Sequence, residues 1–242
     1  MKRHPPPISL ARRAGAEAVG TALLLATVVG SGIMAERLSG GNVALALLAN
    51  SLATGSALVA LILTFAGISG AHFNPAITVA DATQGGLPWR FVPAYVVAQV
   101  GGAFAGVALA HLMFDASIFS ASHHERSGLG QLAGEFTATF GLTSVIWGCS
   151  RSRPKSTPFA VAAYITAAYW FTSSTSFANP AVTLARAASD TFAGIRPADA
   201  PGFIVAQALG ATTATLFFRW LVPTLPAVAD RVVTVTDREG AI

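Results

Sequence analysis

Two stretches of the sequence carry the same three residues, and they decide the fold. The first is Ser69-Gly70-Ala71-His72-Phe73-Asn74-Pro75-Ala76, and the second is Ser176-Phe177-Ala178-Asn179-Pro180-Ala181. Each stretch opens a helix, because Asn caps a first turn and Pro at the first helical position needs no backbone donor. About ten residues of helical propensity follow, which is about 15 Å or half the thickness of a bilayer. Two such half-helices that enter from opposite faces would meet at the centre.

The composition is that of a membrane protein. Of the 242 residues, 53% are hydrophobic and 11% are charged, whereas soluble domains carry about 25% charged residues. Six apolar stretches approach the roughly 20 residues that cross a hydrocarbon core. They cover residues 14–35, 43–66, 91–114, 130–149, 157–174 and 201–222. The sequence therefore predicts an all-α membrane protein with six transmembrane helices and two re-entrant half-helices.

The predicted spans form two copies of a three-span unit. The segment that begins Ala16-Glu17 has a counterpart that begins Gly134-Glu135, and Gln99 corresponds to Gln207. Because three spans is an odd number, the second copy enters from the opposite side, which gives an inverted 3+3 repeat. The expected order is a cytoplasmic N-terminus, a first repeat, an extracellular loop, a second repeat and a cytoplasmic tail. The expected bounds are residues 1–13, 14–115, 116–129, 130–222 and 223–242.

Positive residues are distributed unequally between the two predicted sides. Six spans place both termini on one side, and that side, together with Arg90 and the loop at residues 151–155, holds most of the 15 Lys and Arg residues. Because positive loops stay in the cytoplasm, we expect both termini there. Short loops, an Ala-rich composition and no recognisable sorting motif favour the inner membrane of a bacterium.

The sequence gives little support for chemistry or for nucleic-acid binding. The single cysteine, Cys149, excludes an intrachain disulfide framework. His123 and His124 lack a third metal ligand, and no Ser, His and Asp set has catalytic spacing. The positive residues interleave with no aromatic binding surface. We therefore expect no enzyme, cofactor, metal site or nucleic-acid partner.

The paired Asn-Pro-Ala motifs, the first quoted stretch and the repeated glutamates Glu17 and Glu135 resemble the major intrinsic protein family, the aquaporins and aquaglyceroporins. The resemblance covers about residues 14–222. It implies a homotetramer in the lipid bilayer, with a passive pore in each protomer. The pore residues that it implies are Asn74, Pro75, Ala76, Asn179, Pro180 and Ala181.

The resemblance also implies how such a pore works. The amides of Asn74 and Asn179 would donate to a solute hydroxyl, and backbone carbonyls before each half-helix would accept from it. The positive helix ends would oppose protons and cations. Glu17 and Glu135 would hold the re-entrant loops, although Glu17 is also consistent with a place near the cytoplasmic interface. His72 would join the pore wall or support its loop.

Four side chains set selectivity in this family. Counting without gaps from the two asparagines places them at Thr54, Ala167, Ser176 and Val182. Relatives carry an arginine at the last position, so the projected ring is wide and lacks a fixed cation. This resembles channels of bacterial arsenic-resistance systems and other metalloid-passing relatives. We expect glycerol-like solutes, metalloid acids such as arsenite, organic arsenicals and water to pass.

The sequence leaves two alternatives open. Arg186 lies four residues after Val182 and on the same helix face, so it either replaces the missing charge, or it faces the vestibule or pairs with Asp190. Two other classes of protein also fit. An ion-coupled secondary transporter shares inverted repeats and broken helices, and a structural membrane protein would have a closed pore.

Overall fold

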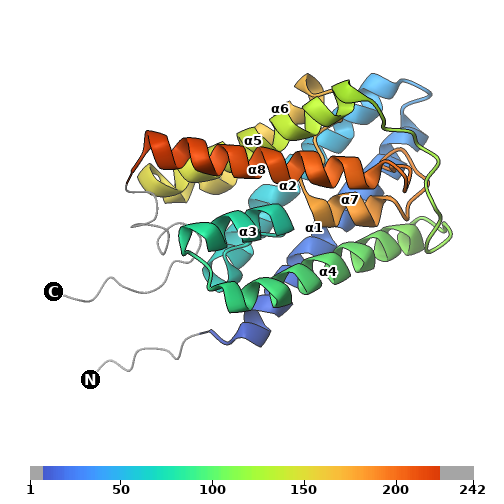
Figure 1. Ribbon diagram of the computed structural model, residues 1–242. Helices are drawn as coiled ribbons and strands as arrows, with labels where there is room; N and C mark the ends of the chain where they lie inside the picture. Colours follow the sequence, from blue (N-terminus) through green and yellow to red (C-terminus); the bar gives the residue numbers. More distant parts are fainter. Residues whose placement is uncertain (1–7, 224–242) are drawn as a thin grey trace.

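The computed structural model describes residues 8–223, except for the side chains of residues 151 and 152. The predicted tail at 223–242 and part of the predicted N-terminal segment therefore lie outside the described residues. Six long helices form the molecule: α1 Leu10–Leu38, α2 Val43–Ser69, α4 Val92–Met113, α5 Leu129–Ser152, α6 Thr157–Phe171 and α8 Ala200–Leu221. Two short helices, α3 Pro75–Gln84 and α7 Pro180–Arg186, lie end to end between α4 and α8 (Figure 1).

The long helices occupy the six predicted spans with shifted ends. α1 begins earlier than predicted because Ser9 caps it and accepts from the N–H of Arg12 at 3.4 Å. α6 has 15 residues and ends at Phe171, because Thr172 is extended. Within the described residues, four helical segments are long and apolar enough to span a membrane by length and composition: Leu10–Leu38, Val43–Ser69, Trp89–Met113 and Ala200–Leu221. α5 carries the buried Glu135 and several hydroxyl side chains, which lowers its apolar character.

The two repeats pack in the same way. α1 lies against α2 and α4 in the first repeat, and α5 lies against α6 and α8 in the second, while α2 against α6 joins them. Small residues allow the close approach. A Cβ at Gly102 would clash with the carbonyl of Ala18, and a Cβ at Gly210 would clash with the carbonyl of Phe136. These pairs occupy matching repeat positions, so the packing confirms the repeat.

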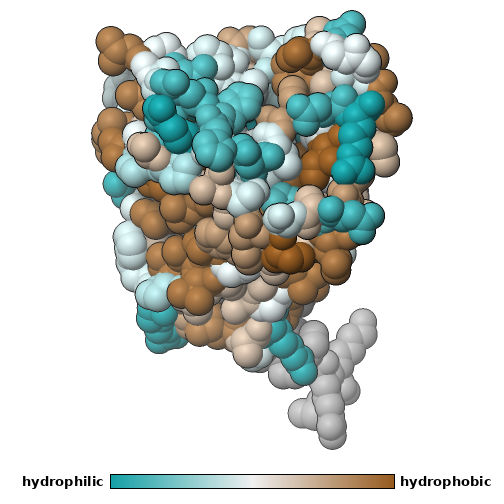
Figure 2. Space-filling view, turned by 90° about the vertical axis from the view of Figure 1, so that its right-hand side faces the viewer, coloured by the Kyte–Doolittle hydropathy of each residue, from teal (hydrophilic) through white to brown (hydrophobic). Residues whose placement is uncertain are grey.

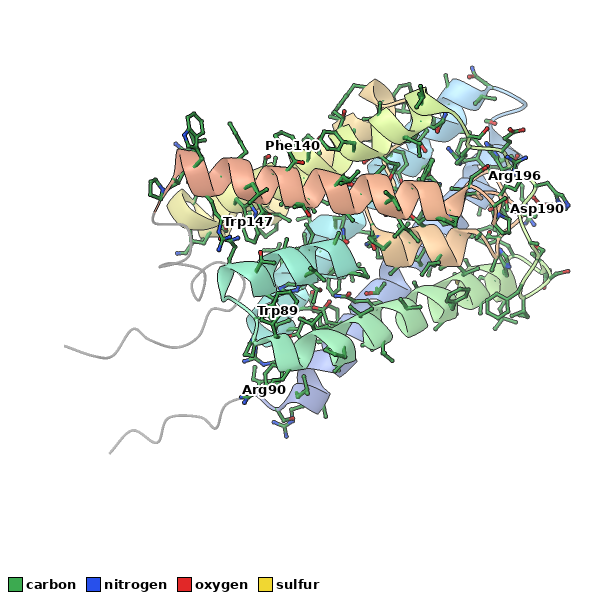
Figure 3. All side chains as sticks on the ribbon, in the orientation of Figure 1. Trp89, Arg90, Phe140, Trp147, Asp190 and Arg196 are labelled. Carbon is green, nitrogen blue, oxygen red and sulfur yellow. The ribbon has the colours of Figure 1, made fainter. Side chains whose placement is uncertain are left out.

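The two ends of the bundle differ in their loops. Trp89 and Arg90 lie at one end, whereas Asp190 and Arg196 lie at the other (Figure 3). The start of α1 and the end of α8 share the end that holds Arg90 (Figure 1). Figure 2 looks onto the opposite end, where hydrophilic residues gather over the upper part of the face and hydrophobic residues border them. The flanks of the long helices expose apolar side chains such as Leu23, Leu52, Val97 and Leu209.

Candidate pore

A cavity lies between the two repeats and takes its lining from both. Residues 70–74 and 176–179 of the re-entrant segments supply its polar side, together with Thr54 and Tyr169. The long helices α1, α2, α5 and α6 supply an apolar side: Leu24, Val28, Leu58, Ile62, Leu142, Ile146, Val161 and Ile165. One wall therefore offers hydrogen bonds and the other does not.

The two pore asparagines cap their half-helices and also bind each other's loops. The side-chain oxygens of Asn74 and Asn179 accept from the backbone N–H two residues later, at 2.9 and 3.0 Å. The amide of Asn74 donates to the carbonyl of Ala178 and that of Asn179 to the carbonyl of Phe73, each at 2.7 Å. Because a primary amide has two N–H donors, one on each Asn stays available to a solute.

The loops before the half-helices hold a strained backbone. Ala71 and Phe73 have φ values of 51° and 49°, and Ser176 and Ala178 have values of 53° and 50°. This left-handed region costs a residue other than glycine about 1–3 kcal/mol, so surrounding contacts must hold it. The same alternation in both loops shows that the repeat extends to backbone conformation.

Glu17 holds the first loop. Its side chain is fully buried, and it accepts from the N–H groups of His72 and Phe73 at 3.0 and 2.7 Å. The hydroxyl of Ser69 donates to it at 2.6 Å and the amide of Gln99 at 2.8 Å. These bonds tie Glu17 to the first re-entrant loop, whatever its depth in the membrane.

Glu135 holds the second loop in the same way. It accepts from the N–H groups of Phe177 and Ala178, both at 2.8 Å, and from the amide of Gln207 at 2.6 Å. Its side chain is also fully buried. Each buried carboxylate thus has several donors, as buried charges require.

His72 both lines the cavity and supports its loop. Its Nδ1 lies 3.0 Å from the hydroxyl of Thr78, and its Nε2 lies 3.8 Å from a carboxylate oxygen of Asp81. The ring of Tyr95 packs beside it, with centroids 5.5 Å apart. The sequence analysis missed Asp81, although its position seven residues after Asn74 matches that of Arg186 after Asn179.

The structure brings together three of the four projected selectivity residues. Thr54, Ser176 and Val182 line the cavity. Ala167 is exposed on the outside of α6 and does not line it, so that projection is wrong. Tyr169, two residues later, lines the cavity, and its hydroxyl lies 3.2 Å from that of Thr54. Because successive helical residues are about 100° apart, a two-residue error selects the opposite face.

Arg186 lies inside the cavity wall. It ends α7, is 2% exposed, and its guanidinium carbon lies 3.4 Å from the centroid of the Phe177 ring. Its Nε donates to the carbonyl of Ala193. Asp190 instead contacts His123 at 3.0 Å, so the structure does not show the alternative in which Arg186 pairs with Asp190. Arg186 therefore lines the cavity.

A second arginine, Arg126, enters from the connecting loop. It is 8% exposed, and its Nε and Nη1 donate to the carbonyls of Gly194 and Ser174 at 2.8 and 3.3 Å. Its guanidinium carbon lies 5.0 Å from the Phe177 ring. Burial lowers the pKa of Arg126 to about 10, so it stays a cation at neutral pH. A lone loop arginine gave no signal in the sequence, because only the tertiary fold places it here.

The described residues contain no group of three or more His, Cys, Asp or Glu side chains that could hold a metal ion. What they contain is a cavity between two inverted repeats, lined in part by the loops before two Asn-capped half-helices. This arrangement defines a helical membrane channel. A model of the family described as major intrinsic protein matches residues 7–168, and the chain belongs to that family. It is a channel and not an enzyme.

Known relatives agree with this assignment. The chain is 53% identical over 220 residues to aquaglyceroporin AqpS of Rhizobium meliloti (strain 1021), covering 90% of this chain and 94% of that protein. It is 34% identical over 143 residues to aquaporin NIP6-1 of Arabidopsis thaliana, covering 59% of this chain and 46% of that protein. The X-ray structure of the Plasmodium falciparum aquaglyceroporin shares the fold, with a TM-score of 0.68 at 23% identity, over 90% of this chain and all of that one.

Proposed function

We propose that the protein is an aquaglyceroporin with a wide outer constriction, which conducts glycerol-like solutes, metalloid acids such as arsenite, organic arsenicals and water. The coarser statement, a passive channel for water and small solutes such as glycerol, follows from the family and from the relatives. The observation that carries the finer proposal is Val182, which lines the cavity directly after the second Asn-Pro-Ala.

The side chains around Val182 support a wide path. Thr54 and Ser176 are also small, and Tyr169 is the aromatic side chain that lines the cavity beside Thr54. A small apolar side chain removes bulk and leaves a solute fewer direct contacts. Uncharged solutes with several hydroxyl groups then exchange water for the carbonyls of the loops and for the free N–H of each pore asparagine.

The centre of the pore opposes charge. The N-termini of α3 and α7 meet there, and their partial positive charges raise the energy of protons and metal cations. Arsenite is mostly the uncharged acid near neutral pH, so it is chemically close to glycerol in this path. Neutral solutes are therefore the substrate class of the proposal.

We also propose that the protein forms a homotetramer in a bacterial inner membrane, with both termini in the cytoplasm and one pore in each protomer. Exposed apolar residues on the flanks of the helices support contact with lipid and with neighbouring copies. The start of α1 and the end of α8 lie at the same end of the bundle, which supports both termini on one side of the membrane. Arg90 lies at that end too, and a positive residue there supports the cytoplasmic side.

Stopped-flow light scattering on proteoliposomes tests the proposal. Purified protein should raise glycerol, arsenite and water permeability above that of empty liposomes, without saturation and without an ion gradient. Val182→Arg should reduce glycerol flux by about tenfold, because the long side chain narrows the path and adds a charge. Saturable uptake that needs a proton or sodium gradient would favour a secondary transporter. Folded protein with no flux would favour a closed structural role.

A further inference from the structure

Two buried arginines lie near the outer part of the cavity without a carboxylate partner. Among the described side chains, basic groups contact carboxylates at His72 with Asp81, His123 with Asp190, and Arg196 with Glu125 and Asp199. None includes Arg186 or Arg126. A buried cation is costly unless it is paired or faces a polar path. Arg186 lines the cavity, whereas Arg126 does not.

The donors of Arg186 are mostly unused. A guanidinium has five N–H donors. The Nε–H binds the carbonyl of Ala193, and within the described part of the chain no protein acceptor binds Nη1 or Nη2. These two amino groups belong to a side chain that lines the cavity. They can therefore donate to a solute in the path.

We propose that Arg186 is the specificity-determining cation of the outer constriction, one helical turn outward from Val182. This inference rests on the proposed channel function and names the residue that selects at its outer end. The planar fork donates to solutes that present two neighbouring oxygens, such as a vicinal diol or an oxyacid, because a guanidinium binds such pairs in a bidentate way. Its charge repels metal cations before they reach the central asparagines.

Neighbouring groups hold the guanidinium in place. The ring of Phe177 lies against it at 3.4 Å, which is an attractive cation–π distance. The Ala193 carbonyl fixes the direction of Nε. Arg126 donates to the carbonyl of Gly194, the residue after Ala193, and its guanidinium carbon lies 5.0 Å from the centroid of the Phe177 ring. Arg126 is therefore a positioning residue, because it holds the segment that orients Arg186.

Chemical rescue of a cysteine variant tests this role. Cys149 is the only cysteine in the sequence, so Arg186→Cys in a Cys149→Ser background carries a single thiol. The measurements are glycerol and urea flux by light scattering and potassium permeability by reversal potential, in proteoliposomes. We expect Arg186→Cys to raise relative potassium permeability about tenfold and to lower the glycerol-to-urea ratio, since urea offers one oxygen.

External methanethiosulfonate reagents of opposite charge then separate charge from size. A trimethylammonium reagent should form a mixed disulfide at residue 186 and restore potassium exclusion, whereas a sulfonate reagent of similar size should not. Arg196→Cys in the same background is the matched control, because Arg196 is a half-exposed outer arginine that does not line the cavity. Its modification should leave both ratios unchanged.

Arg186→Lys keeps the charge without the fork. It should retain potassium exclusion and lose the glycerol preference, which also tests the proposal if the cysteine variant does not fold. The inference is overturned if wild-type protein conducts glycerol while Arg186→Cys and Arg186→Lys keep its ratios, or if both reagents act alike. Wild-type protein without any flux would instead overturn the proposed function, so the two failures are distinguishable.

Discussion

The two ends of the pore, which are inner and outer in the proposed orientation, share one scaffold but differ in the side chains at their mouths. In each repeat a glutamine amide donates to the loop-holding glutamate and to a threonine of the half-helix: Gln99 to Glu17 and Thr78, and Gln207 to Glu135 and Thr183. The residue two positions before the pore asparagine is His72 in the first repeat and Phe177 in the second. The residue seven positions after it is Asp81 in the first and Arg186 in the second.

The comparison separates positions that the fold requires, the two glutamates, from positions at the pore ends that can vary between the repeats. The glutamates are the same in both repeats because each re-entrant loop has two buried backbone N–H groups that need an acceptor. The mouth positions are under no such demand. At the inner end His72 lies beside the carboxylate of Asp81, whereas at the outer end the charge of Arg186 has no carboxylate partner among the described residues. Of Asp81 and Arg186, Arg186 is the one that lines the cavity.

The largest expected effect comes from removing a loop-holding glutamate. Glu17→Ala and Glu135→Ala each leave two buried backbone N–H groups without an acceptor, at about 1–3 kcal/mol for each group. We expect loss of folded protein in detergent, measured by size-exclusion profile and thermal unfolding. Glu125→Ala is the control, because its side chain is 62% exposed. A large loss at one glutamate and none at the other would break the equivalence of the two scaffolds.

The next effect sharpens the difference between the mouths by exchanging their residues. Phe177→His removes the ring that contacts Arg186 and Arg126, and it disrupts an edge contact with Phe203 at 5.2 Å. We expect it to lower the unfolding free energy by about 2–4 kcal/mol, close to the range for losing a buried aromatic ring. Thermal unfolding and cation leakage in proteoliposomes are the measurements.

The reciprocal exchange should cost less. His72→Phe keeps an aromatic ring beside Tyr95. It removes the hydrogen bond with Thr78, which contributes about 1 kcal/mol, and the 3.8 Å contact of Nε2 with Asp81. Thr78 keeps its bond from Gln99, so the scaffold remains. The measurement is again thermal unfolding. If His72→Phe lowers the unfolding free energy more than Phe177→His does, the contacts of His72 contribute more to stability than those of Phe177, contrary to the prediction.

The smallest effect is a pH dependence at His124 in the outer loop. Burial lowers the pKa of His124 below its ordinary value of 6.5, and the nearby charges of Arg126 and Arg186 lower it further, against a smaller opposing effect of Asp190. Below about pH 6.5 the unfolded chain therefore binds a proton that the folded protein does not, so stability falls as the pH falls. His124→Gln should flatten the melting temperature between about pH 7 and about pH 5.5. If the melting temperature of His124→Gln depends on pH as steeply as that of the wild type, another group causes the dependence.

Most of the architecture could be predicted from local signals. The half-helices were predicted from Asn and Pro because capping depends on adjacent residues, and Asn74 and Asn179 do cap α3 and α7. The six long helices were predicted from apolar length. Their ends were less accurate, as at α6, because the turn at Thr172 depends on the loop that follows it.

The sequence by itself determined the inverted repeat, the capped half-helices and the buried glutamates, because each has a local pattern that recurs in both halves of the chain. The tertiary structure alone decided which residues meet in the pore. It placed Tyr169 and not Ala167 at the cavity, gave each pore asparagine a partner in the other repeat, and brought Arg126 to Phe177. These contacts join distant segments, and helix rotation and loop path set them, so no local pattern in the sequence encodes them.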